Sequence, residues 1–334
     1  MKFKKSFFIS LVLYTSTLFA DSSAVAFMYH RFDEAKYPST NIKMEQFKEQ
    51  LSYLKENNYN VWHLSKIISH IKDKKELPPK TIALTIDDAY ISFYENGYPL
   101  LKEFGFAFSL MVSTNPIDVK SKNYMSWSQM REMQEHKAEF INHSVLHKYL
   151  IDKNKEEITK EILKAQKRLQ DELGSSTNEN PRLFSYPFGE YDQRVEAILE
   201  ELDFIGITQT SGAIGFDTDL RRIPRFPMAE AYASMESFIT KLNTKPMPII
   251  SVLPKDNLIE ENNPPKLTIT LKERLHNIQC FTSNGEKINH TWISQTQLEV
   301  VANEKLKQPR DKYTCTAPTM KNKWYWYSHL WIIK

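Results

Sequence analysis

Two acidic residues and two histidines lie at positions from which they could share a metal ion. Asp87 and Asp88 follow the apolar run Thr81–Leu84, and His143 and His147 follow a second apolar run, four positions apart. Histidines at positions i and i+4 of a helical turn present both imidazoles on one face, within reach of one divalent cation. With one carboxylate as the third ligand, a fourth position stays open for water, as in catalytic zinc sites. Each pair alone has a commoner interpretation, because acidic residues often cap helices and surface histidines often have this spacing.

A third segment, residues 182–192, again leads an apolar run into a tight turn, which contains Pro187 and Gly189. Such a turn can present a backbone N–H group to an oxyanion, and its aromatic side chains can line a sugar-binding cleft. Tyr186, Pro187 and Tyr191 are therefore candidates for substrate contacts. On its own, however, this segment indicates only a turn.

Taken in order and spacing, the three segments resemble the polysaccharide deacetylases of the NodB-homology type, that is, enzymes like those of carbohydrate esterase family 4. Ile86-Asp87-Asp88-Ala89 is similar to the family's TFDDG motif, with Ile for Phe and Ala for Gly. His143-Ser144-Val145-Leu146-His147 matches its H-[ST]-x-x-H motif without departure, and Ser185-Tyr186-Pro187-Phe188-Gly189 resembles its R-x-P-[YF]-G motif. Met28-Tyr29-His30-Arg31 also resembles the first strand of many members, so the resemblance covers about residues 24–243.

The resemblance implies a role for each matching residue. Asp88, His143 and His147 would hold the metal, usually zinc, and Asp87 would be the general base that takes a proton from the attacking water. The metal and the backbone N–H group of Phe188 would stabilise the tetrahedral oxyanion. The implied reaction is the removal of acyl groups from a carbohydrate polymer.

Two departures from the family pattern leave roles open. The arginine that commonly braces the base is replaced by Ser185; Arg225, or else Arg222, could supply the charge from a neighbouring strand, and a solvated basic cluster is the alternative. The family's late Leu-x-His motif, which provides the general acid, is missing, because no histidine lies between Arg225 and His276. His30, at the end of the first strand, is the candidate acid, and a buried structural histidine is the alternative.

Short apolar runs alternate with amphipathic helical patterns between about residues 24 and 243. The strand candidates are apolar on both faces, as buried parallel strands are: Ala24–Tyr29, Thr81–Ile86, Phe106–Val112, Phe140–Ile141, Leu183–Tyr186 and Phe204–Thr208. Helical patterns cover Met44–Asn57, Ser92–Phe104, Ser126–Glu135 and Glu156–Leu173. This alternation predicts an α/β fold, either a barrel or a doubly wound sheet, and roughly six to eight units favour a barrel. The resemblance likewise implies a distorted (β/α) barrel, which we place at residues 21–245.

The character of the chain changes after residue 245. Five prolines within residues 245–265 predict a linker, which we place at residues 246–265. Beyond it, alternating patterns predict a small β-sandwich over residues 266–334, with strands at Leu267–Leu271, Thr291–Ile293, Gln297–Val301 and Lys323–Ile332. The aromatic run Trp324–Trp331 could form a sugar-stacking face, although packing in a core or against the barrel is the commoner use of such residues.

The only two cysteines of the sequence, Cys280 and Cys315, both fall in this C-terminal region. In an exported protein such a pair predicts a disulfide, here one that closes a loop of 36 residues with both ends counted. Two free buried thiols are the alternative.

Residues 1–20 are typical of a secretory signal peptide. Lys2, Lys4 and Lys5 precede the mostly apolar stretch Phe7–Phe19, and Ala20 ends a candidate cleavage site. An uncleaved N-terminal anchor is the alternative, although the stretch is short for a membrane span and no other segment approaches that length. Either way the sequence predicts a periplasmic or secreted protein, with no stable membrane span once the signal is cleaved.

Charge argues against a nucleic-acid partner. Without residues 1–20 the chain has 41 basic and 41 acidic residues, whereas nucleic-acid-binding domains normally carry a basic surplus. The resemblance implies a hydrolase that removes N-acetyl groups from an amino-sugar polysaccharide, such as a surface polysaccharide or peptidoglycan. Two alternatives stay open: an O-acetyl esterase, whose leaving group needs less help from an acid, and a catalytically weak carbohydrate-binding protein. Nothing in the sequence indicates the oligomeric state.

Overall fold

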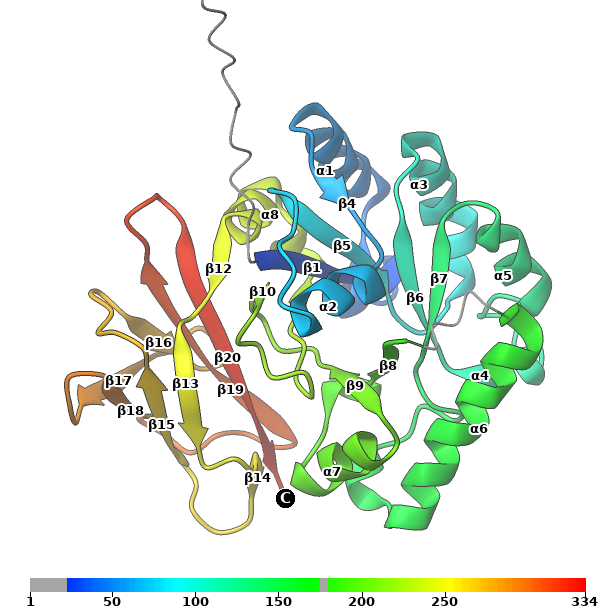
Figure 1. Ribbon diagram of the computed structural model, residues 1–334. Coiled ribbons are helices and arrows are strands. Elements are labelled where there is room, and N and C mark those ends of the chain that lie inside the picture. Colours follow the sequence, from blue (N-terminus) through cyan, green and yellow to red (C-terminus); the bar gives the residue numbers. More distant parts are fainter. Residues whose placement is uncertain (1–22, 175–179) are drawn as a thin grey trace, which may run out of the picture.

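The computed structural model describes residues 23–174 and 180–334, and it contains two sheet regions of different kinds (Figure 1). Helices surround the N-terminal sheet, whereas strands build the C-terminal region (Figure 1). The predicted signal peptide at residues 1–20 lies outside the described residues. Among the helices of the described ranges, we find none with the length and apolar character that a membrane crossing requires.

The first sheet has the strand order β10-β1-β5-β6-β7-β8-β9, with β4 and β11 attached to β5 and β1. Its strands are β1 (Ser23–Tyr29), β4 (Asn60–Val61), β5 (Thr81–Ile86), β6 (Phe108–Val112), β7 (Ala138–Asn142), β8 (Arg182–Ser185), β9 (Phe204–Ile207), β10 (Ile214–Gly215) and β11 (Phe226–Pro227). All neighbours are parallel except β10, which is antiparallel to β1. Every residue of β1, β5, β6 and β7 is buried, as expected of strands that are covered on both faces.

Residues 223–227 close this sheet into a distorted barrel. Ile223 forms a parallel bridge to Ile207 of β9, and Phe226 of β11 pairs with Phe27 of β1. The two ends of the sheet are therefore joined through one short segment, and the predicted α/β barrel is confirmed over the doubly wound alternative. Because the strands are parallel, their carboxyl ends meet at one mouth of the barrel, where catalytic groups of such folds collect.

Helices pack around the outside of the barrel (Figure 1). They are α1 (Met44–Glu56), α2 (Leu64–Lys72), α3 (Tyr98–Phe104), α4 (Thr114–Asp118), α5 (Trp127–Gln134), α6 (Lys155–Leu173), α7 (Gln193–Glu201) and α8 (Met235–Leu242). Helices α5 and α6 each begin with a reciprocal capping box, which explains why they start close to the predicted positions. The helix predicted at Ser92–Phe104 is divided into a π-helical turn, Phe93–Gly97, and α3, because Pro99 lacks the N–H group that would continue the regular bonding pattern.

The second sheet has the order β12-β20-β19-β16-β17-β18-β15-β13, with β14 attached to β20. Its strands from residue 266 onward are β15 (Lys266–Leu271), β16 (Gln279–Phe281), β17 (Lys287–Trp292), β18 (Gln297–Val301), β19 (Arg310–Pro318) and β20 (Trp324–Ile333). The sheet folds over on itself, because alternate residues of β15 share one core with Tyr313, Cys315 and Ala317 of β19, four strands away in the sheet. This is the predicted β-sandwich. Cys280 of β16 lies opposite Cys315 of β19, and the two form the predicted disulfide.

The stretch predicted as a linker is part of this second sheet. Strand β12 (Thr244–Pro246) and strand β14 (Leu258–Ile259) pair with β20, and β13 (Ile249–Leu253) pairs with β15. The prediction of a linker at residues 246–265 is therefore wrong. Proline does not prevent these pairings because Pro248 and Pro254 flank β13, and Pro246 is the last residue of β12, which lies at the edge of the sheet.

Strand β20 packs both on its own core and on the barrel. Trp331 is buried beside Tyr313, with ring centroids 5.7 Å apart, whereas Trp326 meets Phe226 of β11 edge to face at 5.2 Å. Trp324 is exposed at the end of the strand. The aromatic run thus contributes to a core and to the contact between the two sheets, and it does not present one continuous stacking face.

Candidate metal centre and active site

Three residues from two strand ends meet at the barrel mouth. Asp88 follows β5, while His143 and His147 follow β7. The Asp88 Oδ1 atom lies 3.4 Å from His143 Nε2 and 3.2 Å from His147 Nε2. The three ligand atoms all lie within 4.8 Å of one another, close enough to hold one ion.

The two histidines do not lie on a helical turn, so this detail of the prediction is wrong. The loop after β7 takes left-handed backbone conformations at Ser144 (φ 69°) and His147 (φ 51°), and the imidazole centroids are 4.7 Å apart. The loop is fixed by the Asn142 side chain, which accepts from Ser144 N at 3.0 Å, and by Glu161 of α6, which accepts from Val145 N at 3.0 Å. A loop therefore achieves the convergence that a helix was expected to provide.

The chemistry of these groups fits a divalent transition metal. The Nδ1 atom of His143 lies 2.8 Å from the Ser185 carbonyl oxygen, which places its proton there and leaves the Nε2 lone pair toward Asp88. Nε2 is buried and finds no hydrogen-bond partner among the described residues, as expected of a ligand atom. Burial and the neighbouring His143 lower the pKa of His147 to about 4, which keeps this imidazole neutral and able to coordinate.

Asp87, the predicted base, is fully buried and forms a bidentate ion pair with Arg225. Arg225 Nη1 donates to Asp87 Oδ1 at 2.5 Å, and Nη2 donates to Oδ2 at 2.9 Å. Burial by itself would raise the pKa of Asp87, but the charge and hydrogen bonds of Arg225 outweigh it and hold this pKa below its usual value. The carboxylate is therefore ionised at neutral pH and able to accept a proton.

Of the two arginine candidates, Arg225 is the one that pairs with Asp87. It is itself fully buried, and its Nη2 atom also donates to the hydroxyl of Ser185 at 3.2 Å, the residue that replaces the arginine of the family motif. Arg222, the other candidate, instead pairs with Glu196 at 2.5 Å and does not reach Asp87.

The two remaining candidates for catalysis are His30 and Phe188. The Nε2 atom of His30 is 3.8 Å from Asp87 Oδ2, and the His30 side chain is 13% exposed. Phe188 has a left-handed backbone (φ 59°) within the turn Pro187–Gly189, and its ring packs against His147 at 4.4 Å.

Tyr186, Pro187 and Tyr191, predicted as substrate contacts, are buried and line no open cleft at the metal ligands. Tyr186 is 0% exposed and its hydroxyl donates to the Arg221 carbonyl oxygen at 3.0 Å, while Tyr191 is 2% exposed. Both belong to the cluster that packs under α7, together with Phe184 of β8. Their burial does not favour direct contact with substrate, which stays a prediction.

Sequence reasoning missed a stack of planar groups next to Asp88. The Arg31 guanidinium lies between the rings of Tyr37, at 3.9 Å, and Tyr90, at 3.5 Å, and Tyr90 meets Tyr124 at 5.1 Å. Tyr90 lies close enough to Asp88 that burial and this carboxylate together raise its pKa. The available signal was their position in the motifs, since Arg31 directly follows His30 and Tyr90 lies two positions after Asp88.

Gln209 was also missed, and no sequence signal points to it. Its Nε2 atom donates to Asp87 Oδ2 at 3.4 Å, and its side chain packs on Gly189 of the turn, where an added Cβ would lie 2.6 Å from Gln209 Cβ.

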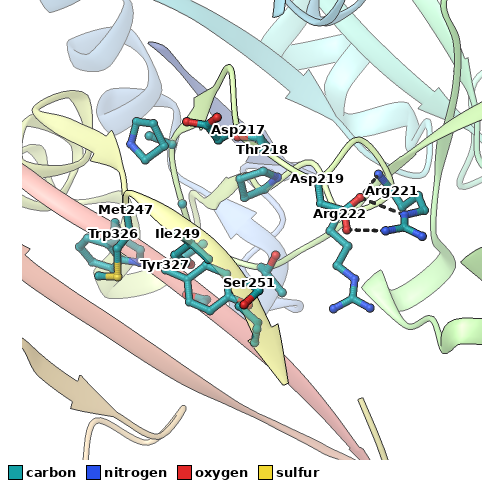
Figure 2. Close-up of a pocket in the computed structure, with 18 of the residues that line it drawn as sticks. Asp217, Thr218, Asp219, Arg221, Arg222, Met247, Ile249, Ser251, Trp326 and Tyr327 are labelled. Atoms are coloured by element: carbon teal, nitrogen blue, oxygen red, sulfur yellow. Dashed lines mark hydrogen bonds and ion pairs between the residues drawn. The ribbon is translucent and has the colours of Figure 1, made fainter. Parts of the chain in front are cut away.

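A cavity of about 480 Å³ lies away from the metal ligands, between the barrel and the second sheet (Figure 2). Asp219 and Arg222 line it from the barrel, and Trp326 and Tyr327 line it from β20 (Figure 2). Both arginines that line it are already paired, Arg222 with Glu196 and Arg221 with Asp219. Apart from Tyr191 and Arg222, no predicted site residue lines this cavity, so it is separate from the candidate metal centre.

Comparisons with known proteins agree with this geometry. The family described as polysaccharide deacetylase matches residues 74–207, which contain all three metal-binding candidates. A poly-β-1,6-N-acetyl-D-glucosamine N-deacetylase of Staphylococcus epidermidis is 26% identical over 232 residues, or 61% of this chain and 78% of that protein. The enzyme of the same name from Escherichia coli is 23% identical over 66% of this chain, which spans only 38% of its length.

Solved structures share the barrel. A Streptococcus pyogenes deacetylase in complex with acetate has a TM-score of 0.61 and 22% identity, and covers 66% of this chain and 98% of its own. IcaB of Ammonifex degensii has a TM-score of 0.55 and 22% identity, and covers 65% of this chain and 97% of its own. These structures support the fold of the N-terminal region. Residues 74–207 of this chain therefore match the polysaccharide deacetylase family, a family of hydrolases, and the chain also has a second, C-terminal sheet domain.

Proposed function

We propose that the protein is a zinc-dependent deacetylase that hydrolyses the N-acetyl groups of an amino-sugar polysaccharide outside the cytoplasm. The observation that carries this proposal is the convergence of Asp88, His143 and His147 beside the ionised, arginine-braced Asp87. Relatives named as N-deacetylases of poly-β-1,6-N-acetyl-D-glucosamine support the choice of an N-acetylated substrate.

Each residue of the site has a part in the proposed reaction. A zinc ion held by Asp88, His143 and His147 would polarise the acetyl carbonyl and lower the pKa of a water molecule. Asp87 accepts the proton of that water on its carboxylate, and Arg225 keeps this carboxylate charged and correctly oriented. The backbone N–H group of Phe188 donates to the developing oxyanion.

An amide substrate also needs a group that protonates the departing nitrogen. We assign this part to His30, because it lies 3.8 Å from Asp87 and is not one of the three ligand residues. It can receive a proton at the site while the other two imidazoles are committed to the metal. With His30 as the acid, the reaction does not need the late histidine of the family pattern, which this sequence lacks.

Acetate release tests the proposal directly. Zinc-loaded protein should release acetate from oligomers of β-1,6-linked N-acetylglucosamine, from chitooligosaccharides or from N-acetylated cell-wall glycan, and a chelator should abolish the reaction. Asp87→Asn should bind zinc but lose turnover. The matched control is Asp171→Asn, which removes an exposed carboxylate paired with Lys167 on helix α6 at the barrel surface. Full activity in Asp87→Asn would refute the base assignment, and no acetate from any polymer would favour a carbohydrate-binding protein.

A second candidate is an esterase that removes O-acetyl groups. The missing late histidine favours it, because an ester's leaving group needs less help from an acid. Parallel measurements on N-acetylated and O-acetylated forms of the same glycan distinguish the two, and a higher kcat/KM on the O-acetylated form would replace our first choice.

The proposed location is the periplasm or the cell exterior. The Cys280–Cys315 disulfide supports it, because such bonds persist in oxidising compartments. The signal peptide that would direct export lies outside the described residues. Fractionation of cells that express the full chain tests this point: we expect the protein outside the cytoplasm, and recovery in the cytosol would contradict the proposal.

A further inference from the structure

Strand β19 of the second sheet reaches the turn beside the metal centre. Arg310, at its start, forms an ion pair with Glu190, the residue that directly follows the turn Pro187–Gly189. Glu190 is only 2% exposed, and burial raises the pKa of its carboxyl group even with Arg310 beside it. A buried carboxylate without a counter-charge is strongly unfavourable, so the arginine of the second sheet neutralises a charge that the barrel itself leaves in place.

Lys312 lies two residues further along β19, on the same face of the strand. Its Nζ atom donates to the backbone carbonyl of Gln209 at 3.5 Å. The side chain of Gln209 donates in turn to Asp87 Oδ2 at 3.4 Å and fills the space beside Gly189. Gln209 is therefore in contact with the base, the turn and the second sheet at once.

A second point of attachment lies at the end of the same barrel segment. Asn257, which is fully buried in the loop before β14, donates from Nδ2 to the Tyr191 carbonyl oxygen at 2.8 Å. Asp256 accepts a longer bond from the backbone of Gln193 at 3.4 Å. Barrel residues 190–193 are thus held by side chains that follow them by more than sixty positions in the chain.

We propose that the second sheet is a structural part of the active site, in which Arg310 and Lys312 act as positioning residues. Arg310 and Lys312 hold the turn that carries Phe188 in the arrangement that the reaction requires. They also hold Gln209 against Asp87. The sheet would accordingly affect the rate of the chemical step more than the capture of polymer. This inference rests on the proposed roles of Phe188 and Asp87.

The size of the effect follows from how sensitive catalytic geometry is. A misplacement of about 1 Å in a catalytic constellation can reduce the rate about 100-fold. We therefore expect Arg310→Met with Lys312→Met to lower kcat by about 10-fold or more, with KM changed less than about twofold and zinc stoichiometry unchanged. Lys266→Met is the matched control, because it removes an exposed lysine of the same sheet that pairs with Glu299 of the neighbouring strand β18.

A charge-matched rescue separates positioning from general damage. Arg310→Met leaves Glu190 buried without a counter-charge, whereas Glu190→Gln with Arg310→Met removes both charges. The double variant should regain at least part of the lost kcat, and it provides a folded protein should the single variant fail to fold. No recovery, in a double variant that melts like the wild type, would overturn the role of the ion pair.

Hydrogen exchange provides a test that does not depend on activity. The N–H groups of Gly189 and Glu190 donate to Tyr186 and Pro187 within the turn, at 2.9 and 3.1 Å. Peptides that contain these amides should exchange faster in the Arg310→Met, Lys312→Met double variant than in wild type or Lys266→Met. If the wild type releases no acetate, the proposed function fails while exchange still decides whether the sheet holds the turn. Unchanged exchange together with unchanged kcat would overturn this inference.

Discussion

Replacement of Arg225 by methionine should reduce both the stability of the barrel and the charge on its proposed base. Arg225 and Asp87 are both fully buried and are joined by two hydrogen bonds, at 2.5 and 2.9 Å. Removal of one partner from a buried ion pair costs about 3–5 kcal/mol, because the other charge stays without compensation. We expect the free energy of unfolding of metal-free Arg225→Met to fall by this amount.

The same change should move the pH dependence of catalysis. Burial opposes the charge of Asp87, and Arg225 outweighs it, so the pKa of Asp87 lies below its usual value. A lowered pKa contributes stability that is present above the ordinary aspartate pKa of about 3.9 and is lost as the pH falls through the folded value. Without Arg225 the burial effect dominates and the pKa rises. One pKa unit corresponds to about 1.4 kcal/mol. If about a third of the 3–5 kcal/mol lost with Arg225 appears as a higher pKa of Asp87, the acid limb of the pH profile of kcat/KM shifts upward by about one pH unit.

Urea titration and the pH profile of kcat/KM measure these two effects. Arg221→Met is the matched control, since it removes an exposed arginine paired with Asp219 and should change stability by less than about 1 kcal/mol. Asp87→Asn combined with Arg225→Met should be more stable than Arg225→Met alone, because no buried charge is left unpaired. An Arg225→Met protein with unchanged stability and an unmoved acid limb would refute this reasoning.

Three further predictions concern separate parts of the molecule. Reduction of the Cys280–Cys315 disulfide should lower the free energy of unfolding by about 3–4 kcal/mol, measured by denaturant titration with and without reductant, whereas a smaller loss would contradict the loop-entropy estimate. Tyr186→Phe removes one buried hydrogen bond and should cost about 1 kcal/mol in the same titration while KM stays unchanged; a raised KM would restore Tyr186 as a substrate contact. His30→Gln should lower kcat about 100-fold on N-acetyl substrates and less on O-acetyl substrates, and equal losses on both would argue against His30 as the acid.

Much of the barrel was predictable because its strands carry a strong local signal. Thr81–Ile86 is apolar on both faces, and the observed β5 has the same bounds as the predicted strand. The metal ligands were predictable from two short motifs, since residues at the carboxyl ends of parallel strands necessarily meet at one mouth. The disulfide was predictable by counting, because the sequence has only two cysteines.

What failed depended on side-chain direction and on long-range contacts. Tyr186 and Tyr191 lie in the right motif, but both rings are buried in the core cluster that also contains Phe184 of β8. The link from β19 to the turn joins Arg310 to Glu190 across 120 positions, and no local pattern reports such a pairing. The linker was predicted from proline content alone, which does not distinguish prolines between strands from prolines in an unpaired segment.

A zinc-soaked crystal examined by anomalous diffraction tests the central claim most directly. The account predicts one strong peak at zinc-ligand distance, about 2.0–2.2 Å, from Asp88 Oδ1, His143 Nε2 and His147 Nε2, with a further position open to solvent beside Asp87. A peak elsewhere, or no peak within reach of these three atoms, would contradict the metal centre and the hydrolase mechanism built on it.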